Sequence, residues 1–196
     1  MKTWVYFGCL CFYACFAPSS VTAQSKPSLQ NSQSGIIYGP NFAYTISAPK
    51  GWIMDESAGK HQGLSVVFYR KGESWKRGKA VMYVNVTNRK GGYSVNKAIS
   101  FDIADHKKAY PKSKVTRAET IRTADHRKSA TYLFDNPADK TAAKEQVAYV
   151  ETPTVVLLIA LTSESEKNFR NAVADHTALV KSVAYLGTKT DREKAR

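Results

Sequence analysis

The tripeptide Ala-Asp-His occurs three times, at residues 104–106, 124–126 and 174–176, in a chain with only four histidines. Aspartate and histidine can bind zinc or act as general acids and bases, so the repeat suggests a dispersed metal or catalytic site. Neighbouring residues on a helix point about 100° apart, so one Asp-His pair cannot chelate a single ion. A site would therefore need histidines from different elements, and His106 and His176 form the best pair.

Both of these histidines also fit a structural role, because each continues the apolar stripe of a predicted helix and could bond a backbone carbonyl or a carboxylate. His126 lies in a polar turn and is expected to be solvated. Asp102 and Asp105 are three residues apart, as on a solvated helix face. The sequence predicts no catalytic residue, metal site or cofactor, and a metal-assisted or general-base hydrolase using His106 and His176 stays open as the alternative function.

The first residues of the chain predict export. Lys2, an apolar run over residues 4–17 and small residues ending at Ala23 form a signal peptide (1–23), and the run is too short to span a membrane. All three cysteines lie in this segment, so the mature chain has no disulfide and no cysteine-based site. Simple export to the periplasm or the extracellular space is favoured, with lipidation of Cys15 as the alternative.

The charge of the protein is strongly positive. The formal net charge is +13, and removal of Lys2 with the signal peptide leaves +12. Such a field attracts an anionic envelope component (a lipid headgroup or a polysaccharide), an acidic protein or, less favoured, nucleic acid; a merely solubilising surface is the alternative. The candidate contact residues lie in two basic segments: Arg70, Lys71, Trp75, Lys76, Arg77, Lys79, Lys107, Lys108, Lys112 and Lys114.

Trp75 stands among the bases of the first segment. An exposed indole there could anchor at a membrane interface or stack on a base or a sugar. The alternative is that Trp75 folds back onto the sheet. Trp52 follows a strand and is expected in the core.

Apolar patterning predicts one domain over residues 36–186, between a flexible leader (24–35) and a disordered charged tail (187–196). Strands are predicted at 36–39, 42–49, 64–72, 79–89, 114–123, 128–136, 144–151 and 154–163, and helices at 94–110 and 164–186. The last strand is apolar throughout, which indicates burial on both faces. Short connections predict an α+β fold: a mainly antiparallel sheet covered by helices.

The stretch FAYTISAPKGW (42–52) resembles the opening signature of the PsbP-like family, an aromatic strand that ends in Pro-x-Gly-Trp. The similarity continues through the order of strands and helices to residue 186, except that Asp125-His126 replaces a turn where relatives often carry Gly-Gly. The resemblance implies an antiparallel sheet between helices. It also implies a non-enzymatic binding or assembly module, because the family shares no single reaction.

Overall fold

Ten strands and two α-helices run through residues 34–137 and 143–188, the part of the chain that this computed structural model describes. The predicted signal peptide lies outside this part, as do most of the predicted leader and tail. The strands are β1 (Ser34–Gly39), β2 (Phe42–Ser47), β3 (Trp52–Asp55), β4 (Val66–Arg70), β5 (Val81–Asn88), β6 (Lys114–Arg117), β7 (Ser129–Asp135), β8 (Lys144–Glu151), β9 (Val155–Ser163) and β10 (Ala184–Gly187). The helices are α1 (Val95–Ala109) and α2 (Glu166–Lys181), with single 3₁₀ turns η1 (Lys60–Gln62) and η2 (Lys90–Gly92).

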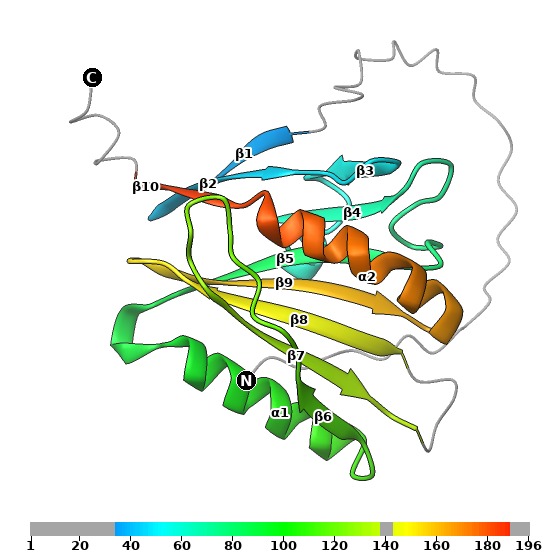
Figure 1. Cartoon of the computed structure of the whole chain (residues 1–196). Coiled ribbons are helices and arrows are strands. Elements are labelled where there is room, and N and C mark those ends of the chain that lie inside the picture. The colour runs from blue at the N-terminus through cyan, green and yellow to red at the C-terminus, as the bar shows by residue number, and fades with distance from the viewer. Residues whose placement is uncertain (1–33, 138–142, 189–196) are drawn as a thin grey trace, which may run out of the picture. The chain divides into compact units, whose positions relative to one another are not determined.

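The strands form two antiparallel sheets (Figure 1). The larger has the order β3-β4-β5-β9-β8-β7-β6, and the smaller has the order β1-β2-β10. β9 occupies the middle of the larger sheet and is buried along most of its length, as its apolar sequence predicts. The predicted α+β class is confirmed.

The two helices cover opposite faces of the seven-stranded sheet. Side chains alternate along β8, so Val147 and Ala148 point to different faces. Val147 packs in one cluster with Ala98 of α1, whereas Ala148 packs in the other with Leu179 of α2. The sheet therefore separates the α1 face from the α2 face.

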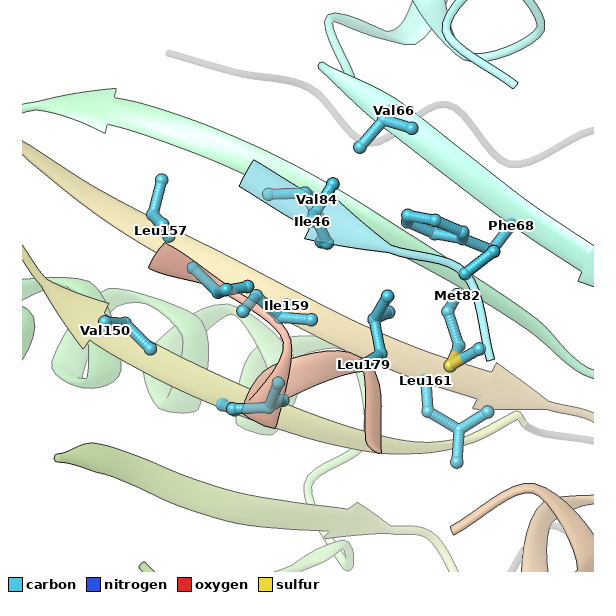
Figure 2. Close-up of a cluster of buried hydrophobic side chains, with 14 of the residues drawn as sticks. Ile46, Val66, Phe68, Met82, Val84, Val150, Leu157, Ile159, Leu161 and Leu179 are labelled. Atoms are coloured by element: carbon cyan, nitrogen blue, oxygen red, sulfur yellow. The ribbon is translucent and has the colours of Figure 1, made fainter. Parts of the chain in front are cut away.

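The α2 face carries the larger core. Figure 2 shows side chains of β2, β4, β5, β8, β9 and α2 meeting there, and the three-stranded sheet closes the layer with Ile37, Tyr44 and Ile46. Many of these side chains have no solvent exposure. Each fully buried aliphatic or aromatic side chain contributes about 1.5–3 kcal/mol, so this layer supplies much of the stability. The predicted burial of Trp52 is confirmed, since it is 4% exposed.

The predicted C-terminal helix (164–186) is too long at both ends. Ser165 is the N-cap and accepts from the Asn168 amide, at 3.4 Å. The helix stops at Lys181, because the chain turns at Ser182 and residues 184–187 form β10 against β2. A run of four apolar residues directly after a helix is too short for its periodicity to distinguish a short strand from a further helical turn.

Two other predictions need correction. Residues 118–123 are not a strand, because β6 ends at Arg117. Trp52–Asp55, which the sequence did not single out, forms β3 at the sheet edge. β1 starts at Ser34, so the last two residues of the predicted leader belong to a strand.

Candidate functional site

Strand register places the basic loop (residues 69–79) and the basic corner (residues 107–114) at the same end of the seven-stranded sheet. The loop leaves the end of β4 and enters β5, which begins beside the end of β9. Lys114 is the first residue of β6 and pairs with Asp135 at the end of β7. The start of β8 lies between the end of β7 and the end of β9, so all of these strand ends lie on the same side of the sheet. From β4 to β6 the sheet advances five strand spacings, about 24 Å. One end of the sheet thus carries both basic segments (Figure 1).

Two acidic groups at this end, Asp135 and Glu166, are paired with cations outside the candidate set. Lys144 contacts Glu166 and lies 3.4 Å from Asp135, and Arg170 contacts Glu166 at 2.5 Å. Seven candidate residues are exposed and form no ion pair within the described residues: Lys71, Lys76, Arg77, Lys79, Lys108, Lys112 and Lys114. Their charge is therefore open to solvent.

Arg70 is engaged within the fold. Its Nη2 lies 2.9 Å from Asp175 Oδ2, and its guanidinium carbon lies 4.8 Å from the centre of the Trp52 ring. Trp52 Nε1 donates to the same carboxylate oxygen at 3.0 Å. Asp175, the acidic residue of the third triplet, thus fastens the end of β4 and the start of β3 to α2.

Trp75 is half-buried, in the folded-back arrangement. Its Nε1 donates to Gln62 Oε1 at 3.2 Å, and its ring meets the Tyr83 ring edge-on, with 6.1 Å between centres. The indole therefore braces the basic loop against η1 and β5, and an anchoring role does not follow from this position.

A pocket of about 310 Å³ opens within the basic loop. Its lining consists of Gly72, Glu73, Ser74, Arg77 and Lys79. Two of these residues belong to the predicted contact set. Glu73 and Ser74 were not predicted, because neither forms a recognisable motif.

The basic corner follows the last turn of α1. Lys107 Nζ donates to the Ser113 carbonyl, which ties the helix end to the turn before β6. Lys108, Lys112 and Lys114 stay exposed. Because β6 is an edge strand and Lys114 is its first residue, the charge of Lys114 also discourages pairing with another chain, which is a structural reason for that charge.

His176 is a fully buried structural residue, with 0% exposure. Its Nε2 lies 2.9 Å from the Ile159 carbonyl, which can only accept, so Nε2 carries the proton. Its Nδ1 lies 3.0 Å from Gln146 Nε2 and accepts from that amide. Burial lowers the pKa of His176 to about 4, against the smaller raising effect of the Ile159 bond, and the ring stays neutral.

His106 lies on the other face of the sheet. Its ring contacts Tyr110 and Phe134, with 5.3 and 5.2 Å between centres. Its buried Nε2 has no hydrogen-bond partner among the residues that the structure describes. Burial lowers its pKa, and Lys107 adds to the shift. The sheet separates His106 from His176, so the pairing that the hydrolase alternative requires is wrong.

The second triplet forms a turn, as predicted. His126 is exposed and adopts φ 64°, the left-handed conformation that a glycine would adopt freely at this position. Asp125 accepts from Thr123 Oγ1 at 2.5 Å, Arg127 Nε at 2.7 Å and the Tyr185 amide at 3.2 Å. This carboxylate therefore holds the turn against β10.

Three tyrosine–carboxylate pairs line the α1 face, and none of them was predicted from the sequence. The hydroxyls donate to carboxylates at 2.6–3.0 Å in Tyr83–Glu145, Tyr149–Asp102 and Tyr69–Asp55. Asp102 was expected on a solvated helix face, but it turns toward the sheet. Burial raises the pKa of Glu145 to about 7, and Asp102 adds to this rise while the bond from Tyr83 opposes it.

Across residues 34–137 and 143–188, His, Cys, Asp and Glu side chains do not gather in any group of three suited to a metal ion. Within the same residues, no helix combines the length and apolar character needed to cross a membrane.

No protein-family model and no curated protein matches the chain. Among solved structures, the solution structure of cyanobacterial PsbP (CyanoP) from Synechocystis is similar, with a TM-score of 0.50 and 13% identity over 84% of this chain and 99% of that chain. A crystal structure from Bacteroides thetaiotaomicron aligns with a TM-score of 0.40 and 10% identity over 73% of this chain and 45% of that chain. The chain therefore has a PsbP-like fold, as the stretch 42–52 predicts.

Proposed function

We propose that this protein is an exported, non-enzymatic binding module of the cell envelope that contacts an anionic surface through the basic end of its sheet. The observation that carries the proposal is the strand register: two basic segments, separated in sequence by the 28 positions from Lys79 to Lys107, lie at one end of the seven-stranded sheet. Export rests on the signal-peptide pattern of residues 1–23.

The spacing of the two segments favours an extended surface over a single small ligand. They are about 24 Å apart across the sheet, and charges separated by more than the Debye length of about 8–10 Å act independently. Each lysine or arginine close to an anionic bilayer contributes about 1 kcal/mol, so two clusters add their effects on a flat partner. Lipid headgroups or acidic polysaccharide provide such a partner.

Charge reversal at one cluster tests this proposal. Lys76 and Arg77 are exposed, so K76E/R77E changes the charge of the basic loop without touching a described ion pair. We expect at least a tenfold loss of binding to phosphatidylglycerol vesicles in a sedimentation assay, together with strong salt dependence in the native protein.

The matched control is K90E/K128E, which makes the same change in net charge at the opposite end of the sheet. Both lysines are exposed, one after the end of β5 and one before the start of β7. Equal losses in the two variants would show that only net charge matters, and undiminished binding by K76E/R77E would remove the basic loop from the proposal. An electrophoretic shift at physiological salt tests the nucleic-acid alternative.

A further inference from the structure

Two hydrogen-bonded turns define the backbone of the basic loop around the pocket. The Glu73 amide donates to the Arg70 carbonyl at 2.9 Å, and the Arg77 amide donates to the Ser74 carbonyl at 3.1 Å, so two successive turns form its rim. Gly72 adopts φ 87°, as the third residue of a type II turn requires. The pocket is therefore a formed feature of the loop.

The closing side of the loop is fixed to the sheet. Ser163 Oγ of β9 donates to the Lys79 carbonyl at 2.6 Å. A Cβ atom on Gly78 would lie 2.6 Å from Val81 Cγ1 and 3.2 Å from the Ser74 carbonyl oxygen. The backbone at Gly78 thus approaches the Ser74 turn more closely than a residue with a Cβ atom would allow.

The pocket combines charges of both signs. Arg77 and Lys79 supply two exposed cations that form no ion pair within the described residues. Glu73 Oε2 accepts from the Lys79 amide at 3.1 Å, while its Oε1 has no donor in the described part of the chain. Ser74 adds a hydroxyl. A site for a simple anion would be weakened by this carboxylate, because like charges repel.

We propose that this pocket binds a zwitterionic phosphoethanolamine group, with the phosphate between Arg77 and Lys79 and the ammonium at Glu73. The inference rests on the proposed function, since it identifies one ligand within the basic end of the sheet. Cationic side chains match the phosphate by charge-assisted hydrogen bonds, and the free carboxylate oxygen matches the ammonium. A volume of about 310 Å³ is at the lower end of small-ligand sites, which suits a small headgroup.

A purely structural role for Glu73 can be distinguished from a role in binding the ammonium group. In Glu73→Gln the amide carbonyl still accepts from the Lys79 amide, so the brace is kept and only the charge is lost. Glu73→Gln therefore keeps the pocket while it removes the partner of the ammonium. Arg77→Ala removes a partner of the phosphate instead.

Calorimetric titration of the purified protein with O-phosphoethanolamine, inorganic phosphate and ethanolamine tests the inference. We expect O-phosphoethanolamine to bind at least tenfold more tightly than either fragment. Glu73→Gln should lower that affinity about tenfold and leave phosphate binding equal or stronger, whereas Arg77→Ala should weaken both. Equal affinity for phosphate and O-phosphoethanolamine, or unchanged affinity in Glu73→Gln, would overturn the proposal.

Vesicle binding distinguishes phosphoethanolamine as a lipid headgroup from phosphoethanolamine in another molecule. It also separates the pocket inference from the proposed binding of an anionic surface. Binding to phosphatidylethanolamine in a phosphatidylcholine background should fall in Glu73→Gln, while binding to phosphatidylglycerol should hold or increase because a negative charge is lost. Calorimetric binding of O-phosphoethanolamine without binding to phosphatidylethanolamine vesicles would assign the pocket to a free or polysaccharide-linked phosphoethanolamine group. Phosphatidylglycerol binding without any O-phosphoethanolamine binding would refute this inference and leave the proposed function intact.

Discussion

The two faces of the seven-stranded sheet bury polar groups in opposite ways. The α2 face encloses one neutral base, His176, whose two ring nitrogens are both hydrogen-bonded. The α1 face carries carboxylates paired with tyrosine hydroxyls, and one histidine, His106, whose Nε2 has no partner. The same tripeptide thus supplies a fully hydrogen-bonded core histidine on α2 and a histidine with one unpaired ring nitrogen on α1. Burial and partners, which differ between the faces, decide what each histidine contributes.

The sharpest test of this contrast replaces each histidine by leucine. His176→Leu should lower the free energy of unfolding by about 2–4 kcal/mol, because the Gln146 amide loses its acceptor in a buried site. His106→Leu should stay within about 1 kcal/mol of the native protein or stabilise it, because it removes an unpaired polar atom from an aromatic contact. Urea unfolding at pH 7 measures both, and equal losses would abolish the distinction.

Acid should destabilise the protein through the α2 face. The pKa of His176 is about 4 in the folded protein and about 6.5 in the unfolded chain. Below pH 6.5 the unfolded chain therefore binds a proton that the native state does not bind until the pH approaches 4. The resulting stability is fully present above pH 6.5 and is lost as the pH falls through 4, by about 3 kcal/mol in all. Urea unfolding at pH 7 and at pH 4.5 measures the loss. His176→Leu should lack this loss, whereas His106→Leu should retain most of it, and equal pH profiles of the native protein and His176→Leu would contradict the assignment.

The carboxylate that joins α2 to the sheet edge should contribute less. Asp175→Ala removes the acceptor of Trp52 Nε1 and the partner of Arg70 on a partly exposed surface. We expect a loss of about 1–2 kcal/mol in the free energy of unfolding, most of it from the hydrogen bond of the buried indole. Asp175→Asn, which keeps an acceptor oxygen, should recover part of it. A loss in Asp175→Asn as large as in Asp175→Ala would assign the effect to charge instead.

The α1 face should show the opposite dependence on pH. The pKa of Glu145 is raised to about 7 when folded, so the native state holds a proton that the unfolded chain has already released between pH 4.5 and 7. Its contribution is present below pH 4.5 and is lost as the pH rises through 7. Glu145→Gln should remove this loss of stability at rising pH. Glu119→Gln, which changes an exposed carboxylate, should leave it in place. Unfolding midpoints at pH 5 and pH 7.5 decide between these outcomes.

The binding role of the predicted contact residues stays a prediction, but the structure shows that most of them are exposed and that Arg70 is engaged within the fold. Exposed lysines and Arg77 could be found because runs of bases are visible in sequence. That Arg70 is held by Asp175 could not be found, because the two residues are 105 positions apart and meet only when α2 lies across β4. Glu73 was hidden for a different reason: a single acid in a basic run has no pattern until the loop folds around it.

The sequence by itself determined the α+β class, the central strand and the first helix, since periodicity depends on residues close together in the chain. The family resemblance already implied helices on both sides of the sheet, and the structure agrees. Only the tertiary structure decided that residues 184–187 become a strand and that the two basic segments share one end of the sheet. Strand pairing and helix placement are contacts between distant residues. Their outcome depends on which apolar surfaces fit together, and local patterns do not encode that choice.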